Sequence, residues 1–106
     1  MTSKIELINR LQSLENKNVL QAVEELRACG MLEDGSLRGI ALCQAVLQNA
    51  KLDNADLCYT DFHQAILDDA DLSSAKLQAA KLNRASLRSV NLEGADLTNA
   101  DIIWIF

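Results

Sequence analysis

The sequence predicts a mainly β solenoid, in which the backbone coils around a narrow apolar interior, preceded by a short α-helical cap. The first observation is a period of five: from residue 35 onward a bulky apolar residue, here called the centre, occupies every fifth position. The second is that ten of the fourteen positions lying two residues before a centre are Ala. The third is that residues 1–32 lack this period and space their apolar residues as a helix does. The centres are Leu37, Leu42, Leu47, Leu52, Leu57, Phe62, Leu67, Leu72, Leu77, Leu82, Leu87, Leu92, Leu97 and Ile102.

A period of five fits neither a helix nor a flat strand. In an α-helix five residues advance by about 500°, so successive centres would circle the axis instead of forming a stripe. In a flat strand an odd period places alternate centres on opposite faces. All centres can share one interior only if the chain turns between repeats, so the chain must coil, with successive coils at the usual strand spacing of roughly 4.8 Å.

The repeat Ala-(Asp/Asn)-Leu-X-X resembles the repeat of the pentapeptide repeat proteins, over roughly two-thirds of the chain. The resemblance implies a right-handed quadrilateral β-helix with one repeat per side, twenty residues per coil and about 3.5 coils, or roughly 15–17 Å of axial length. The period alone does not determine the number of sides. Clear instances of the repeat are Ala55-Asp56-Leu57, Ala70-Asp71-Leu72 and Ala95-Asp96-Leu97.

Size and charge limit the function. We expect one folded unit with a helical cap at 1–32 and the β-helix at 33–106. Residues 1–32 carry four basic and four acidic residues, whereas residues 33–106 carry six basic and eleven acidic ones. Because this net negative charge lies on the solenoid, direct binding to nucleic acid is not expected.

No targeting or membrane segment is evident. The first thirty residues lack the apolar run of a signal peptide, and the run at 102–106 is too short to span a bilayer. The three cysteines include no Cys-x-x-Cys spacing, which is typical of a reducing compartment. We therefore expect a cytoplasmic protein without a membrane contact.

Two short helices are expected before the solenoid. Apolar residues at three- and four-residue spacings predict a helix over 4–14, and Asn16 to Asn18 interrupt it. A second helix follows, with Asn18 as a plausible N-cap and Gly30 as a plausible C′ residue. Helices this short are marginal alone, so both should dock on the first coil, where Leu32, Leu37 and Ile40 offer apolar surface and open strand edges need cover.

The segment Gly30–Gly39 also resembles the junction between helix and solenoid in some bacterial pentapeptide repeat proteins. We interpret residues 1–32 as a cap. The alternative is a helical hairpin that binds a partner.

The interior should be narrow because the Ala positions admit no larger residue without overpacking. Gly35, Ile40, Thr60 and Val90 depart from Ala, and Thr60 has no evident reason to do so. The predicted structural core consists of Leu42, Leu47, Leu52, Leu57, Phe62, Leu67, Leu72, Leu77, Leu82, Leu87, Leu92 and Leu97.

The residue before each centre should point outward and stack on its equivalent twenty residues later. Two such columns alternate in charge, which favours weak attraction between neighbouring coils. These charge ladders either hold the coils in register or form a recognition stripe for a partner. They are Asp56, Lys76, Asp96 and Asp61, Lys81, Asp101.

Candidate chemistry is weak. Asp68, Asp69 and Asp71, with Asp53 one coil away, could suit a hard cation, but no ligand loop accompanies them and a solvated acidic corner is the default.

His63 lies near Asp61, yet the sequence has no oxyanion turn or nucleophile elbow. Cys43 and Cys58 should face outward on different sides, and Cys29 lies on the second helix, so neither a zinc site nor a redox pair is indicated. We predict no catalytic residue, no metal and no cofactor.

The tail departs from the repeat because apolar residues occupy its outward positions. Ile103, Trp104 and Phe106 form a candidate interface. The tail either folds over the last coil as a cap or joins two copies as a homodimer, as the ends of some family members do. A chain cut from a longer protein is the remaining alternative.

We therefore predict a non-enzymatic protein–protein interaction or scaffold module with an unidentified protein partner. The alternative follows from the resemblance: some pentapeptide repeat proteins mimic duplex DNA and bind DNA gyrase, modulating the topoisomerase or conferring quinolone resistance. Such mimicry needs a long, mainly negative face. This solenoid is short, and basic residues lie among its acids.

Overall fold

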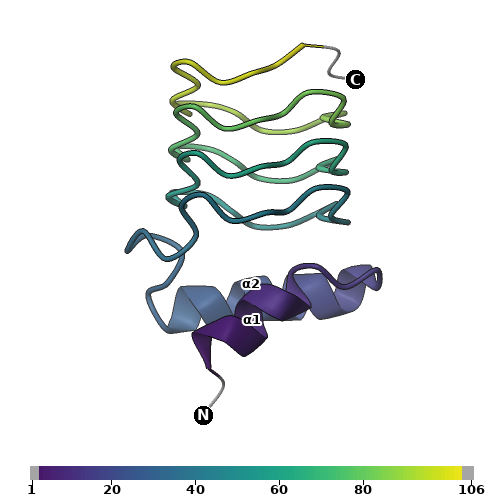
Figure 1. Cartoon of the computed structure of the whole chain (residues 1–106), viewed down its shortest axis with the longest axis vertical. Coiled ribbons are helices and arrows are strands. Elements are labelled where there is room, and N and C mark those ends of the chain that lie inside the picture. Colours follow the sequence, from purple (N-terminus) through teal and green to yellow (C-terminus); the bar gives the residue numbers. More distant parts are fainter. Residues whose placement is uncertain (1–2, 104–106) are drawn as a thin grey trace.

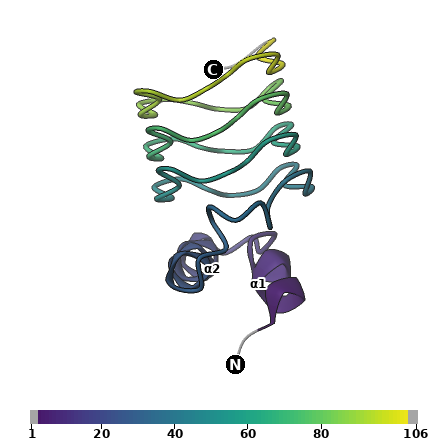
Figure 2. The same cartoon turned by 90° about the vertical axis from the view of Figure 1, so that its left-hand side faces the viewer.

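The computed structural model describes residues 3–103 as two short helices at one end of a stack of coils (Figure 1). Helix α1 spans Lys4–Arg10 and helix α2 spans Asn16–Ala28. A linker over 29–34 leads into the first coil at 35–54, and the coils then follow at 55–74, 75–94 and 95–103. A view turned by 90° shows both helices beneath the first coil (Figure 2).

Parallel backbone bridges join residues twenty positions apart, so each coil holds four five-residue repeats. In the described residues a side of a coil contributes one bridging residue rather than a longer strand. The bridges are Ala41–Asp61, Val46–Ile66, Lys51–Asp71, Asp56–Lys76, Asp61–Lys81, Ile66–Ser86, Asp71–Asn91, Lys76–Asp96 and Lys81–Asp101.

We number the four sides of the solenoid by their centres. Side 1 has Leu42, Phe62, Leu82 and Ile102; side 2 has Leu47, Leu67 and Leu87; side 3 has Leu52, Leu72 and Leu92; side 4 has Leu37, Leu57, Leu77 and Leu97.

The backbone hydrogen bonds of a repeat explain why the coils stack. The centre and the residue two positions after it donate to carbonyls of the next coil, and the residue before the centre donates to the previous coil. A turn bond joins each centre to the small residue that opens the next repeat. Around Leu67 these bonds are Leu67 N to Ser86 O (2.8 Å), Asp69 N to Arg88 O (2.8 Å), Ile66 N to Ala45 O (2.9 Å) and Ala70 N to Leu67 O (3.0 Å).

Each corner of the coil places the residue two positions after a centre in the left-handed region. A positive φ at the third residue of a four-residue turn is the pattern of a type II turn, which reverses the chain tightly enough to close a coil. Two of these residues are glycines, Gly39 with φ 70° and Gly94 with φ 72°. The others are not glycine and have φ between 56° and 64°: Gln44, Asn49, Asn54, Tyr59, Gln64, Asp69, Ser74, Ala79, Arg84, Ser89 and Asn99.

The backbone N–H directly after a centre is left out of the bonds between coils. Where the residue before the centre is Asp or Asn, its side-chain oxygen accepts this N–H, which gives a physical reason for that residue type in the repeat. The pairs are Asp56 with Cys58, Asp61 with His63, Asp71 with Ser73, Asn91 with Glu93, Asp96 with Thr98 and Asp101 with Ile103.

The interior is filled by the centres and by the small residues two positions before them. The predicted core residues from Leu42 to Leu82 are buried, including Phe62 with no exposed surface. Leu87, Leu92 and Leu97 are partly buried and pack against this core. The core is therefore continuous along the axis and becomes more exposed toward residue 103.

Thr60 is fully buried at an Ala position, and the structure explains why. Its Oγ1 donates to the carbonyl of Leu37, at 2.9 Å. The carbonyl of Leu37 also accepts the turn bond from Ile40 N, which is long at 3.5 Å, so the Thr60 hydroxyl gives a weakly bonded carbonyl a second and shorter hydrogen bond.

Helix α1 is shorter than the predicted 4–14. It begins at Ser3, whose Oγ accepts from Glu6 N (3.2 Å), and it ends in a tighter turn in which Gln12 N donates to Asn9 O (3.0 Å). This turn frees Gln12 to face the first coil.

The predicted N-cap of the second helix is wrong. Helix α2 already begins at Asn16, so Asn18 lies inside it and Glu15 takes the cap position. The start of this helix could not be predicted from the sequence, because the side chain of Asn16 binds the solenoid rather than the backbone of its own helix.

The predicted C′ residue is confirmed. Gly30 has φ +75°, and Met31 N donates to Leu26 O (2.9 Å) as the Schellman motif requires.

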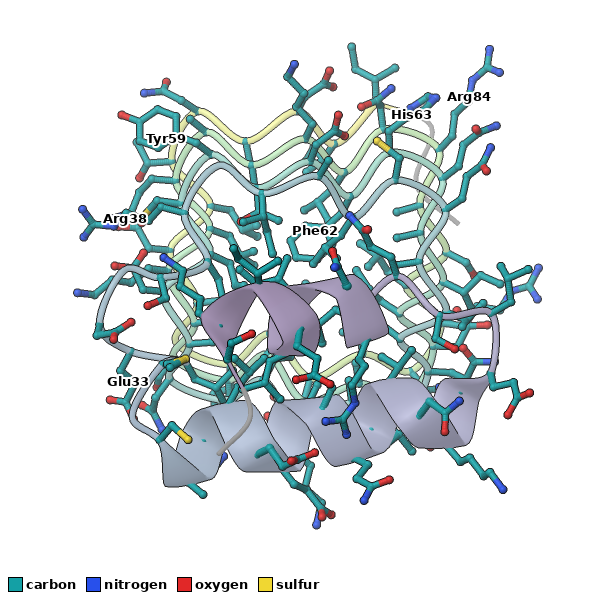
Figure 3. The ribbon with its side chains drawn as sticks, turned by 60° about the horizontal axis from the view of Figure 1, so that its bottom comes forward. Glu33, Arg38, Tyr59, Phe62, His63 and Arg84 are labelled. Atoms are coloured by element: carbon teal, nitrogen blue, oxygen red, sulfur yellow. The ribbon has the colours of Figure 1, made fainter. Side chains whose placement is uncertain are left out.

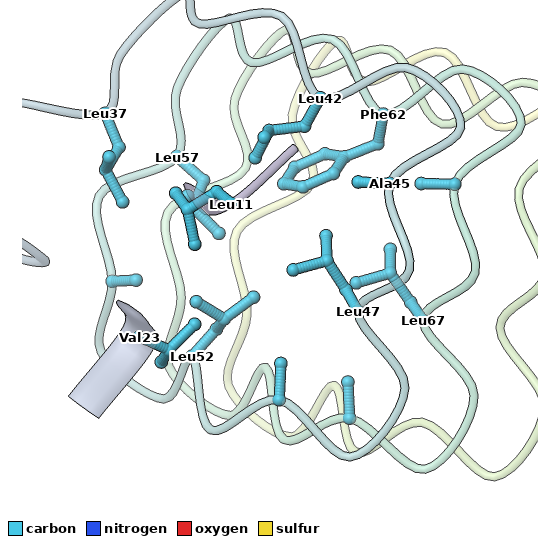
Figure 4. Close-up of a cluster of buried hydrophobic side chains, with 14 of the residues drawn as sticks. Leu11, Val23, Leu37, Leu42, Ala45, Leu47, Leu52, Leu57, Phe62 and Leu67 are labelled. Carbon is cyan, nitrogen blue, oxygen red and sulfur yellow. The ribbon is translucent and has the colours of Figure 1, made fainter. Parts of the chain in front are cut away.

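The apolar faces of both helices pack against the open end of the first coil. Leu11 and Val23 lie over the leucines of this coil, as Figure 4 shows. With Leu7, Val19, Ala22 and Leu26 they join the solenoid leucines in one buried core. The helices therefore bury the apolar end of the interior, as a cap should.

Candidate functional site

The first coil has backbone carbonyls that a preceding coil would otherwise pair, and side chains of the cap bind them instead. Gln12 Nε2 donates to Ala41 O on side 1, at 2.8 Å. Asn16 Nδ2 donates to the carbonyls of Val46 and Gln48 on side 2, at 2.9 and 3.0 Å. These amides occupy the positions of the missing backbone donors.

Side 3 is covered in the same way. Arg27 of α2 donates to Lys51 O (2.9 Å) and Asp53 O (3.2 Å), and it pairs with Asp53 Oδ1 at 2.8 Å. Side 4 differs, because there the linker carbonyl of Leu32 accepts from Asp56 N of the second coil (2.7 Å). The cap thus covers the carbonyl edge on sides 1, 2 and 3, which would otherwise be open to pairing with another chain.

Asp56 was predicted to point into solvent as part of a charge ladder, but it is buried, with 2% of its surface exposed. Arg38 Nε and Nη2 approach its Oδ2, each at 2.7 Å. The hydrogen bond from Arg38 holds the pKa of Asp56 below its usual value against the opposing effect of burial, and the Cys58 N–H assists. The reason for the difference is the linker, which lies against side 4.

The charge ladders stack in register, since backbone bridges join their members along each column. Within residues 3–103, however, neither Lys76 nor Lys81 lies within ion-pair distance of an aspartate. The ladder aspartates are engaged elsewhere because their carboxylates turn back to the N–H after the centre. Asp96, for example, accepts from Thr98 N (3.0 Å) and Gln78 Nε2 (2.9 Å).

Taken by coil, the outward charges form two belts that the sequence reading missed. The second coil contains five acidic residues and no lysine or arginine, and the third contains four basic residues and one acidic residue. Counting charges over each block of twenty residues shows both belts. Comparing residues twenty positions apart does not, because the members of one belt then fall on different sides of the solenoid. The acidic belt is Asp61, Asp68, Asp69 and Asp71, since the fifth acid, Asp56, is buried; the basic belt is Lys76, Lys81, Arg84 and Arg88.

The belts lie on the outside of the coils while the core residues point inward. Figure 3 shows Phe62 directed into the interior, whereas Tyr59 and Arg84 project from two corners of side 1. Tyr59 is 67% exposed.

Histidine and cysteine side chains lack the arrangement of a nucleophilic site. His63 Nδ1 is bonded to the amide of Asn83, and Asp61 accepts the backbone N–H of His63, not its ring. Partial desolvation and the neighbouring Asp61 raise the pKa of Cys43, which makes its thiol less reactive as a nucleophile.

Cys58 was predicted to face outward and is instead buried, with Gln78 and Asp56 bonded to it. Its thiol donates to Gln78 Oε1, at 3.0 Å. Burial and the nearby carboxylate of Asp56 raise its pKa as well.

The acidic corner considered for a cation is divided among other partners. Asp53 pairs with Arg27, and Asp68 accepts from Ser86 Oγ. Within residues 3–103 no cluster of three His, Cys, Asp or Glu side chains could hold a metal ion. Nor does the described part of the chain contain a helix long and apolar enough to cross a bilayer.

A small pocket lies between α2 and the first coil, lined by Leu20, Val23, Glu24, Asn49 and Lys51. Its volume of about 80 Å³ is far below the roughly 300–1,000 Å³ of a site for a drug-sized ligand.

At the other end of the stack apolar side chains are exposed. Ile102 is 48% and Ile103 is 62% exposed. Trp104 and Phe106 of the candidate interface lie outside the described residues. Ile103 is the one residue of that candidate interface that the structure describes.

A stack of twenty-residue coils, each made of four five-residue repeats around a leucine interior, defines a β-helical solenoid of pentapeptide repeats. Comparison with known families matches the family described as pentapeptide repeats, with eight copies over residues 36–73 and 65–102. These matches cover more than half of the chain, which therefore belongs to the pentapeptide repeat family.

Solved structures agree with this assignment. The chain is similar to HetL from the cyanobacterium Nostoc sp. strain PCC 7120, a pentapeptide repeat protein involved in heterocyst differentiation regulation, with TM-score 0.67 and 32% identity over 76% of this chain and 32% of HetL. It is also similar to alr5209, a pentapeptide repeat protein from Nostoc PCC 7120, with TM-score 0.64 and 31% identity over 78% of this chain and 74% of alr5209. The chain thus spans about a third of the length of HetL. Comparison with curated proteins gives no match.

Proposed function

We propose that this pentapeptide repeat chain is a non-enzymatic protein-interaction module that acts in the cytoplasm. The observation that carries the proposal is the division of the repeat: the centres and small residues fill the interior, and the remaining positions form a rigid outer surface of charged belts. A rigid surface loses little conformational entropy on binding, which suits recognition of a protein partner.

The chemistry of the surface supports binding rather than catalysis. The thiols of Cys43 and Cys58 have raised pKa values, and the ring of His63 is bonded to Asn83. The family neighbour HetL is involved in regulation of differentiation. For the present chain, which spans about a third of HetL, a regulatory role through protein contacts is part of the proposal.

The proposal is tested by affinity capture with matched surface variants. Reversing Lys81 and Arg84 to Glu on side 1 removes half of the basic belt, and Lys17→Glu on α2 alters an exposed cation outside the belts. We expect a specific protein captured by the wild type to be retained by Lys17→Glu and lost by the belt variant. Capture of the same proteins by all three chains, or by none, would count against a belt-directed interaction module.

The negative net charge also raises the alternative of a DNA mimic that binds DNA gyrase. The basic belt argues against it, because four cations encircle the third coil where a mimic needs continuous negative potential. A supercoiling assay with purified gyrase decides: we expect no inhibition at micromolar concentrations. The same charge distribution leads us to propose no direct contact with nucleic acid or membrane.

The exposed isoleucines of the last coil keep the end-to-end homodimer as a proposed second contact. Burying Ile103 in such a dimer would remove an apolar side chain from water. Ile103→Glu should then reduce the sedimentation coefficient of the dimer to that of a monomer. A monomeric wild type would exclude this contact.

A further inference from the structure

We propose that two copies of the chain associate side by side and antiparallel through side 2, with the acidic belt of each copy facing the basic belt of the other. The pairing does not depend on the identity of any other protein partner.

Side 2 carries unpaired charges of both signs and one exposed apolar side chain. Asp69 and Arg88 are exposed, and within residues 3–103 neither side chain has a hydrogen-bond or ion-pair partner. Ile66 lies on the same side, one residue before its centre, and is 37% exposed. The surface therefore combines an apolar centre with flanking charges, the usual composition of a protein contact.

The register of the coils brings these groups to matching positions. Asp68 and Arg88 hold the same place in their repeats, directly after the centre, on neighbouring coils of side 2. Asp69 is one residue further along, within reach of a long arginine side chain. A two-fold axis that lies in the contact plane between the second and third coils, parallel to them, places Arg88 of each copy opposite Asp68 and Asp69 of the other.

Charge complementarity selects a second copy as the occupant. Rotation by 180° about this axis exchanges the two belts, so a negative row meets a positive row twice in one contact. The contact is isologous and closes on two copies, which avoids an open filament. The inverse charge pattern that side 2 requires is thus supplied by the same side of another chain.

Sides 3 and 4 are less accessible to a flat partner. Side 3 is bound near the cap by Arg27 of α2, and side 4 carries the linker through the bond from Asp56 to Leu32. Figures 1 and 2 show α2 and the linker extending across the base of the stack. On side 2 the cap contributes only the small side chain of Asn16 to the first coil.

The pairing is expected to be weak and dependent on salt. The molecule measures 38 × 25 × 20 Å, so one side offers a few hundred Å², below the roughly 800 Å² per partner of a standard stable interface. Exposed charges are screened beyond about 10 Å at 0.1 M ionic strength. Association should therefore rise with protein concentration and fall as salt is added.

The test uses the two opposite charge reversals Asp69→Lys and Arg88→Glu, followed by sedimentation equilibrium at low salt. Each reversal alone creates two repulsive contacts in its own pair, and we expect association about tenfold weaker or worse. An equimolar mixture of the two variants restores both attractive contacts, because the cation introduced in one chain then faces the anion introduced in the other, and the unaltered Asp69 and Arg88 face each other as before. In the mixed pair Asp68 of the Asp69→Lys chain also faces the introduced Glu, so the mixture should associate more strongly than either variant alone and fall short of the wild-type dimer fraction.

Matched controls place similar reversals on other sides. Lys76→Glu lies in the basic belt on side 4, and Glu93→Lys lies in the third coil on side 3. Both should leave association at the wild-type level, and circular dichroism verifies that every variant is folded. A wild type that stays monomeric at millimolar concentration and low salt, or a mixture that fails to reassociate, would overturn the proposal. Association abolished by Ile103→Glu and unaffected by the side 2 reversals would assign the dimer to the last coil.

Discussion

Truncating one interior leucine tests the packing on which the fold depends. Leu77 is fully buried on side 4, between Leu57 and Leu97 of the adjacent coils. Leu77→Ala removes three carbons from a column in which coils lie roughly 4.8 Å apart, and the bonded backbone cannot collapse to refill the space. We expect the free energy of unfolding to fall by about 2–5 kcal/mol.

This loss is large relative to the total free energy of unfolding. A chain of this length is stable by about 5–15 kcal/mol, and for a domain of 60–100 residues each kcal/mol shifts the melting temperature by roughly 4–8 °C. Leu77→Ala should therefore melt at least about 10 °C below the wild type. Leu97→Ala is the control within the same column, because Leu97 is only partly buried and its loss should cost less.

Urea unfolding followed by far-ultraviolet circular dichroism and by Trp fluorescence measures both variants. Because coils stack only on their neighbours, hydrogen exchange at the backbone of residues 75–94 additionally reports whether the third coil unfolds with the rest. A Leu77→Ala protein with the midpoint of the wild type, or a Leu97→Ala protein that loses more stability, would refute the continuous interior.

Three further outcomes follow from particular contacts. The pKa of Asp56 is held low by Arg38, so the carboxylate contributes fully to stability above the unfolded aspartate pKa of about 3.9. This contribution is lost as the pH falls through the lower pKa of the folded state. Asp56→Asn removes it, so the melting temperature of the variant should fall less than that of the wild type between about pH 5 and pH 2. Thr60→Val keeps the shape of the side chain but removes the short hydrogen bond to the carbonyl of Leu37, which then keeps only the long turn bond from Ile40 N; it should lower the free energy of urea unfolding by about 1–2 kcal/mol, whereas Thr60→Ser should restore most of it. Asn16→Ala removes two bonds to the first coil and should cost about 1–3 kcal/mol, with hydrogen exchange increasing first at the backbone of the cap; uniform exchange throughout the chain would contradict local release of the cap.

The fold was predictable because one property of the repeat is repeated fourteen times. A bulky residue at every fifth position, with a small residue two before it, leaves coiling as the way to bury them all, and the buried Leu67 and Ala65 are the expected outcome. The preference for Asp or Asn before the centre could not be explained from the sequence. Its cause is a backbone N–H that becomes visible only when the bonds between coils are counted, as for Asp71 and Ser73.

The departures from prediction cluster at the junction between cap and solenoid. Asp56 and Cys58 were placed outside by their positions in the repeat, yet the linker and Arg38 cover them. Asn16 binds carbonyls of the first coil that lack a preceding coil, and Thr60 binds the carbonyl of Leu37 beside the junction. A periodic sequence predicts the interior of a stack of coils. At the end of the stack each missing backbone partner is replaced by a different side chain, and these replacements do not follow the repeat, so the period cannot predict them.

The positions of the repeat that build the interior and the turns differ from most of the positions that face solvent. The interior and the turns use two or three positions of each repeat, and the other positions can change without altering the backbone. Those free positions hold the belts, whose signs reverse from the second coil to the third. Since Lys76 and Lys81 make no ion pair within the described residues and the aspartates bind backbone N–H groups, the belts contribute little to holding the coils together. The side chains of Asp69 and Arg88 are exposed and bind no partner within residues 3–103, so they are available for contacts with another molecule, and side 2 is where we expect that contact.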